Sequence, residues 1–229
     1  MEQRKIISLG RSSLVISLPK HWVELNELKQ GDVVSLAVQR DRSLVVFPGA
    51  RKEENPKITI QVDPDEKTAS LIRRIIACYL NGYFGIKLVS TGIFTVPQQR
   101  AIRNIARMLY LRIMESDAKT IYIQTLLDES KASIETGVHR MHTIACSMCK
   151  DALRALKSGD GGLARIVYSL DYDVDHFSFF LLRLLRKVFT EPTLTNRYGL
   201  DSIDCLDYQT LIHRIEQVAD HAANIAKYV

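Results

Sequence analysis

The sequence has few cysteines and no long run of uncharged apolar residues. Its 229 residues include four cysteines, which is too few for the disulfide framework of a secreted protein of this size. The most apolar stretch, residues 177–188, contains Arg183, Arg186 and Lys187, so no segment is suited to span a bilayer. Residues 1–11 are polar and lack the apolar core of a signal peptide. We therefore expect a cytoplasmic protein that does not insert into a membrane.

Signatures of the common enzyme classes are lacking as well. The sequence holds neither a glycine-rich phosphate-binding loop nor a G-x-S-x-G nucleophile elbow. Residues 159–162 form a glycine-rich turn, but it lacks the lysine of a P-loop. We expect no catalytic residues and a protein that is not an enzyme. The alternative is phosphoester hydrolysis at a multinuclear metal site, which would need an open coordination position beside a pocket.

The residue pattern changes character twice along the chain. Hydrophobic residues make up 46% and charged residues 25%, values typical of packed domains, and the net charge of +5 permits contact with nucleic acid without requiring it. Residues 1–50 hold short β-branched runs with turns, and the polar stretch 48–56 is expected to be a linker. Residues 57–128 alternate strand and helix patterns, and residues 130–229 hold only helix patterns. The expected fold is therefore multidomain: a β head, a small α/β sandwich and a three-helix bundle.

The bundle is expected to consist of long helices over about 130–157, 161–189 and 205 to the end. The second helix has an apolar stripe formed by Leu163, Val167, Leu170, Val174, Phe177, Leu181, Leu184 and Val188. The third helix is expected to bury Leu211, Ile215, Val218, Ala222, Ile225 and Val229.

Two pairs of carboxylates lie beside these stripes. Asp171 and Asp175 are four residues apart on the second helix, as are Glu216 and Asp220 on the third, where Asn224 follows one turn later. Like charges at this spacing weaken an isolated helix by about 0.2–0.5 kcal/mol per pair, so two such pairs in one bundle indicate a cation between them. Carboxylates on neighbouring helices are a common way for bundles to hold metal ions. The alternative is that they are ordinary acidic residues on solvated helix faces.

The segments 170–177 and 215–225 resemble the two acidic signatures of the PhoU family. Each signature has an acidic residue, three others and then aspartate, with asparagine following in the later copy. The resemblance covers residues 130–229 and implies a three-helix bundle that binds a multinuclear metal cluster and regulates phosphate transport negatively. The implied cofactor is an iron or zinc cluster or another divalent cation. The implied ligands are Asp171, Asp175, Glu216 and Asp220, with Asn224 as a neighbour. Many PhoU proteins hold two three-helix repeats, whereas this chain has one.

A row of histidines and cysteines follows one face of the first long helix: Glu135, His139, His142, Cys146 and Cys149. Such residues can bind zinc. However, a C-x-x-C pair inside a continuous helix differs from a zinc knuckle, whose pairs sit on turns. We interpret the two cysteines as small core residues and the two histidines as capping or surface groups.

The N-terminal segment resembles the swapped-hairpin domains of the AbrB/MazE (SpoVT-AbrB) type. The resemblance covers residues 4–48, with its most specific parts at Ser17-Leu-Pro-Lys20 and Leu28-Lys-Gln-Gly-Asp32. It implies that two chains interlock into one barrel, and that the homodimer presents basic residues to DNA. The candidate DNA-binding residues are Arg4, Lys5, Arg11 and Lys20. The alternative is that this domain only dimerises the chain.

The whole arrangement resembles archaeal proteins that join such a head to a PhoU body through a similar middle region. Arginines 73, 74, 100, 103 and 107 of that middle region are either solvated or in contact with DNA or a partner. The sequence therefore predicts a metal-binding, DNA-binding transcriptional regulator of phosphate uptake. The alternative is an adaptor that does not bind DNA, dimerises through its head and docks on the ATPase subunit of a phosphate ABC transporter.

Overall fold

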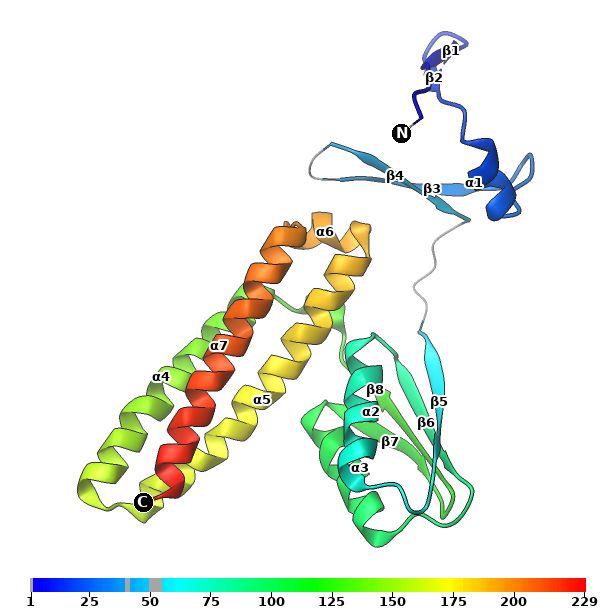
Figure 1. Ribbon diagram of the computed structural model, residues 1–229. Helices are drawn as coiled ribbons and strands as arrows, with labels where there is room; N and C mark the ends of the chain where they lie inside the picture. The colour runs from blue at the N-terminus through cyan, green and yellow to red at the C-terminus, as the bar shows by residue number, and fades with distance from the viewer. Residues whose placement is uncertain (1, 40–41, 50–54) are drawn as a thin grey trace. The chain divides into compact units, whose positions relative to one another are not determined.

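The computed structural model describes residues 2–39, 42–49 and 55–229 (Figure 1). The chain forms two compact units, Met1–Glu53 and Glu54–Val229. The linker expected over residues 48–56 lies mostly outside the described residues. In the described ranges, no helix is long and apolar enough to cross a membrane.

The first unit consists of two separate hairpins joined by a short helix. Its elements are β1 (Ile7–Leu9), β2 (Ser13–Val15), α1 (Lys20–Leu25), β3 (Val34–Val38) and β4 (Leu44–Pro48). β1 pairs with β2 and β3 pairs with β4, both antiparallel, and the two pairs form different sheets. Gly10 has a φ of 70° in the turn between β1 and β2, a conformation that glycine adopts without strain. Pro19 precedes α1, where its missing N–H costs no hydrogen bond.

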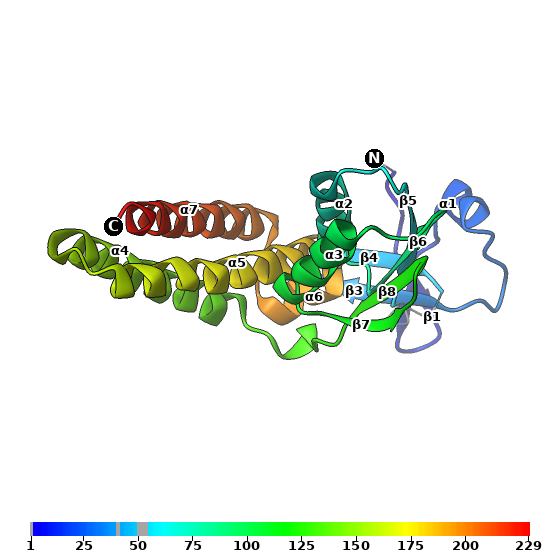
Figure 2. The ribbon, with the colours of Figure 1, turned by 90° about the horizontal axis from the view of Figure 1, so that it is seen from below.

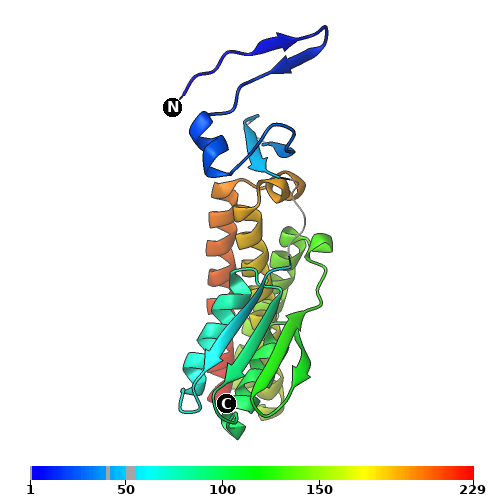
Figure 3. The same ribbon diagram turned by 90° about the vertical axis from the view of Figure 1, so that its right-hand side faces the viewer.

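The second unit begins with an α/β layer. Its elements are β5 (Lys57–Val62), α2 (Thr68–Leu80), β6 (Gly85–Ser90), α3 (Val96–Met108), β7 (Leu111–Ser116) and β8 (Thr120–Thr125). The strand order is β5-β6-β8-β7, with β5 and β6 parallel and the other pairs antiparallel. On β5, Ile60 and Val62 are buried while the alternate residues are exposed. One face of the sheet is therefore covered by α2 and α3, and Figure 3 shows the other face uncovered by helices.

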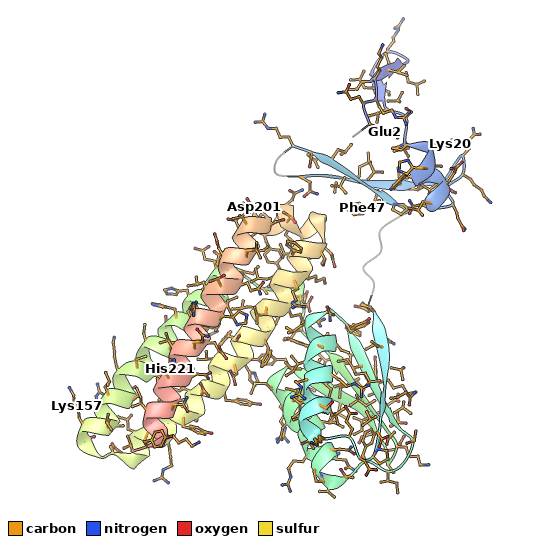
Figure 4. All side chains as sticks on the ribbon, viewed as in Figure 1. Glu2, Lys20, Phe47, Lys157, Asp201 and His221 are labelled. Atoms are coloured by element: carbon orange, nitrogen blue, oxygen red, sulfur yellow. The ribbon has the colours of Figure 1, made fainter. Side chains whose placement is uncertain are left out.

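The remainder of the second unit is helical. It contains a short 3-10 turn, η1 (Glu129–Lys131), followed by α4 (Ile134–Ser158), α5 (Gly161–Thr190), α6 (Pro192–Tyr198) and α7 (Ser202–Lys227). The side chains of Ser133, Asp160 and Asp201 accept hydrogen bonds from the first turns of the three long helices. The long helices lie alongside one another (Figure 2). Lys157 and Asp201 lie at opposite ends of this bundle (Figure 4).

The apolar stripe expected on the second long helix is confirmed, since each of its members is buried or half-buried. The stripe expected on the third helix is wrong in part, because four of its six members are exposed: Leu211, Val218, Ile225 and Val229. The buried face of α7 consists instead of Cys205, Ile212, Ile215, Ala219, Ala222, Ala223 and Ala226. Because alanine lets helices approach closely, this narrow face packs against α4 and α5 while the larger residues flank it.

One arginine fixes the α/β layer to the bundle. Arg183 of α5 is 4% exposed, and its Nε donates to Oε1 of Glu129 at 2.6 Å. Its guanidinium also donates to the backbone carbonyls of Tyr79, Gly82 and Tyr83 at the end of α2. On the same helix, Phe179 packs against the core of the α/β layer. The layer and the bundle are therefore joined by a satisfied buried ion pair and by apolar packing.

Candidate metal centre and nucleic-acid interface

The two carboxylate pairs predicted from the sequence come together in the bundle. Asp175 of α5 and Glu216 and Asp220 of α7 each offer a carboxylate oxygen, and these three atoms lie within 4.8 Å of one another. Because α5 and α7 run in opposite directions, the early part of α5 lies beside the late part of α7. Asp171 is outside this group of three but is close enough to interact electrostatically with Asp175 and Asp220.

The carboxylates repel one another in a partly buried place. Burial and then repulsion from the three neighbouring carboxylates raise the pKa of Asp175 to about 7. Burial and then Asp220 raise the pKa of Asp171 above its usual range. Burial and then Asp220 also raise the pKa of Glu216, although His213 acts in the opposite direction. The cluster therefore carries negative charge that the fold does not stabilise by itself.

Within the residues that the structure describes, this charge is not compensated by a direct ion pair with lysine or arginine. Among the described residues, neither lysine nor arginine forms an ion pair with any of the four carboxylates. Buried or half-buried acidic groups are normally paired with a cation or bind one. Three oxygens from two facing helices are the donor set that hard and borderline divalent ions take in helical bundles. The residues present therefore fit a bound metal ion.

The other candidate ligands lie on α7 and α4. Asn224 is exposed on α7, one helical turn after Asp220. His139 and His142 are exposed on α4, as predicted. The interpretation of both cysteines as core residues is wrong for Cys146, which is exposed and has its Sγ 3.5 Å from Nε2 of His142. Cys149 is half-buried against the core. The α4 register places Met141, Ala145 and Met148 inward, and Cys146 therefore falls on the solvent side.

Sequence reasoning missed an aromatic group that joins the carboxylates to the α/β layer. Tyr172 and His176 follow Asp171 and Asp175 directly, and their ring centroids are 4.4 Å apart. His176 also packs edge-on against Tyr110, which lies between α3 and β7, with centroids 4.5 Å apart. Tyr110 has a φ of 53°, which is unusual for a residue other than glycine. The only sequence signal was the aromatic residues next to both aspartates, and the position of Tyr110 needed the tertiary structure.

The basic residues predicted to contact DNA are all exposed in the first unit. Arg11 lies in the turn between β1 and β2, and Lys5 precedes β1. Arg4 pairs with Glu2 at 2.5 Å, and Lys20 lies 3.6 Å from Glu24. These two exposed pairs contribute little to stability, so they can exchange for phosphates. Arg11 and Lys5 are therefore the residues most available to nucleic acid.

The β1–β2 hairpin also exposes an unusual amount of apolar surface. Ile7, Leu9 and Leu14 are exposed at 59%, 66% and 73%, and of the described residues in this unit only Ala37 is buried. A two-stranded hairpin is at best marginally stable in water without a packed face. The hairpin therefore has an exposed apolar surface of the kind that another chain can bury.

Two family models match separate parts of the chain. Residues 138–229 match the PhoU domain, and residues 7–54 match the domain described as antidote-toxin recognition MazE, bacterial antitoxin. Comparison with curated proteins and with solved structures gave no match. The carboxylate cluster lies inside the first matched region, and the exposed hairpin lies inside the second. The chain thus combines an N-terminal MazE/AbrB-like domain with a C-terminal PhoU domain.

Proposed function

We propose that this protein is a metal-binding, DNA-binding transcriptional regulator of phosphate uptake. The observation that carries the proposal is the pairing of two features in one chain. A PhoU domain holds an uncompensated carboxylate cluster, and a MazE/AbrB-like domain exposes basic residues on an apolar hairpin. The proposed role is binding and regulation rather than catalysis.

In the second unit, Asp175, Glu216 and Asp220 would hold a divalent cation, with Asp171 as a further ligand or charged neighbour. A bound cation would supply the positive charge that these helices lack. The protein's own contribution is to hold α5 and α7 at the spacing of the cluster, through the alanine face of α7. An iron or zinc cluster and a single divalent ion are both compatible with this donor set.

In the first unit, two copies of the head would form a homodimer through the exposed faces of their hairpins. Dimerisation would double the basic residues and present two copies of Arg11 to a DNA site. Lys5 and Arg11 would neutralise phosphates, which predicts affinity that falls steeply with salt. A residue in a hairpin turn can also reach base edges, which would give sequence preference.

The test is fluorescence anisotropy with DNA from upstream of the protein's own gene and of phosphate-transport genes, across a salt series. We expect tighter binding to these sites than to random DNA, with a salt slope that Arg11→Ala and Lys5→Ala reduce. Lys29→Ala is the matched control, because Lys29 is an exposed lysine of the same unit outside the hairpin. Repeating the titration after chelation and after adding Mn²⁺ tests whether the PhoU domain controls DNA affinity.

The alternative function is an adaptor that dimerises without binding DNA and docks on a phosphate transporter subunit. The observation in its favour is that Arg4 and Lys20 already pair with carboxylates of their own chain, which reduces the basic charge offered to DNA. Binding to the promoter sites that is no tighter than to random DNA would reject the regulator for those sites. In that case the head would be a dimerisation module alone.

A further inference from the structure

A hollow of about 490 Å³ lies in the second unit between α2 and α3. Tyr172 of α5 forms part of its wall, so the hollow lies between the α/β layer and the bundle. Its volume falls within the range of small-molecule binding sites, about 300–1,000 Å³. None of the four clustered carboxylates lines it, and neither does any of the basic residues of the first unit.

The walls of the hollow are held in place by specific contacts. The buried side chain of Gln98 donates from Nε2 to the backbone carbonyls of Asp63, Pro64 and Glu66, at 3.0–3.1 Å. These bonds fix the loop that leads into α2, while Gln98 and Thr95 cap α3 reciprocally. On the opposite side, the ring of Tyr172 rests against His176. The hollow is therefore built by packed and hydrogen-bonded elements rather than by a loose surface loop.

The lining is mostly apolar, with a few polar groups. The apolar part is formed by Ile72, Val96, Pro97, Ala101, Ile105 and Met108. Thr68, Arg100 and Asn104 supply the polar side chains. In the described part of the chain, Arg100 makes neither an ion pair nor a side-chain hydrogen bond. A few polar groups on an apolar wall are typical of a site that orients an amphipathic ligand.

The charge of the hollow is positive at one end. Thr68 and Val96, which are the first residues of the two 13-residue helices α2 and α3, both line it. Neither helix has an acidic residue within its first turn, and the carboxylate of Glu66, just before α2, is already bonded to Ser70 and Arg74. The guanidinium of Arg100 adds a full positive charge one turn further along α3. An anionic group of a ligand would be attracted to this end of the hollow. An apolar chain of the same ligand would pack against the apolar wall.

We propose that this hollow binds a small amphipathic carboxylate, with its apolar chain against Ile72, Ala101 and Met108 and its carboxylate at Arg100. The inference does not depend on the proposed metal or DNA binding. Because Tyr172 follows Asp171 in the chain, the ligand would touch the helix that carries two of the clustered carboxylates. The probe that matches this lining is a free carboxylate with a single apolar chain of medium length.

The test uses the full chain labelled with ¹³C at its methionine methyl groups and titrated with sodium octanoate. Of the five methionines, Met108 lines the hollow, whereas Met141 and Met148 are fully buried in the bundle core. We expect a saturable shift of the Met108 resonance with little change at the other two. Octylammonium, which has the same chain and the opposite charge, should shift Met108 far less. No Met108 shift at millimolar octanoate, or proportional shifts of all the methionines, would overturn the proposal.

Two variants separate the charge from the cavity. Arg100→Gln should lower the affinity for octanoate about tenfold or more, because it removes a charge-assisted contact. The affinity for neutral octanol should not change. Arg103→Gln is the matched control, since Arg103 is exposed on the same helix but does not line the hollow. Ala101→Trp should abolish the Met108 shift by filling the space, while unchanged Met141 and Met148 resonances show that the bundle is folded. Equal octanoate affinity in Arg100→Gln and wild type would also reject the proposed orientation.

Discussion

Arg183 and Glu129 form a buried ion pair, with Nε 2.6 Å from Oε1, at the point where the bundle meets the α/β layer. Lys187 reaches the second oxygen of the same carboxylate at 3.1 Å, and Tyr198 of α6 donates to the backbone carbonyl of Glu129. Arg183 lies on α5, the helix that also carries Asp171 and Asp175. One helix therefore joins the carboxylate cluster to the α/β layer, so a change in its position affects both.

Replacing Arg183 should destabilise the second unit strongly. Arg183→Ala leaves Glu129 buried with only Lys187 and removes the donors to the end of α2. Removing one partner of a buried pair costs about 3–5 kcal/mol. We expect a loss of this size in the unfolding free energy, measured by urea denaturation. Arg186→Ala on the same helix is the control, because Arg186 is exposed, and it should change stability by less than about 0.5 kcal/mol. Similar losses in the two variants would show that the buried pair does not stabilise the junction.

The same pair predicts a dependence of stability on acid. Burial alone would raise the pKa of Glu129, but Arg183 and Lys187 hold it below the usual value of 4.5. A carboxylate with a lowered folded pKa contributes stability that is fully present above its unfolded pKa and is lost as pH falls through the folded pKa. The difference in unfolding free energy between wild type and Glu129→Gln should therefore be constant near neutrality and shrink below about pH 4.5. A difference that stays constant down to pH 3 would contradict this assignment.

Metal binding should depend on pH through Asp175. Its pKa of about 7 means that a proton occupies the site below neutrality and competes with a cation. We expect the affinity for Mn²⁺ to rise with pH up to about 7 and then level off, with about one proton released per ion at pH 6 and none at pH 9. Calorimetric titrations in buffers of different ionisation enthalpy measure this release.

Asp175→Asn is the control for that measurement. It should bind Mn²⁺ more weakly at every pH and lose the proton release at pH 6, because the titrating group is gone. An additional control is Asp173→Asn, since Asp173 lies between the two clustered aspartates in sequence but is exposed and outside the three-oxygen group. Proton release that persists in Asp175→Asn would assign the titration to another group.

The sequence identified features that repeat or that follow local rules. The acidic spacing on α5 and α7 was visible because it occurs twice, and Asn81-Gly82 and Pro192 indicated correctly where α2 and α5 end. Contacts between distant segments were not visible. Arg183 appeared only as a charge interrupting an apolar run, because its partner carbonyl at Tyr79 lies 104 residues away. The hollow likewise depends on contacts of Gln98 and Tyr172 with residues that are distant in the sequence. The sequence pattern also did not indicate the short helix α6, which lies between the stronger helix patterns of α5 and α7.

The stripe on α7 shows why periodicity alone misplaced a buried face. Helical spacing predicts that the large apolar residues form the core, but Val218 is 47% exposed and the neighbouring Ala219 is fully buried. A helix packed tightly between two others turns its smallest residues inward, and its larger ones fall on the flanks. Hydrophobic size therefore misleads where alanine is abundant, as in the last two turns of this helix.

The exposed hairpin predicts that the head requires a second chain. Leu14 is 73% exposed on β2, opposite Ser8 in the register of the pair. If a partner hairpin covers this face, Leu14→Glu places an unpaired charge in the interface and should shift the protein from dimer to monomer in sedimentation velocity experiments. Ser12→Asp, in the exposed turn, adds the same charge outside the paired strands and should leave the dimer intact. Because the β1–β2 hairpin has no packed core of its own, the monomeric variant should also show reduced protection of the β1 and β2 amides in hydrogen exchange. A dimer that persists with Leu14→Glu would place the contact between chains elsewhere.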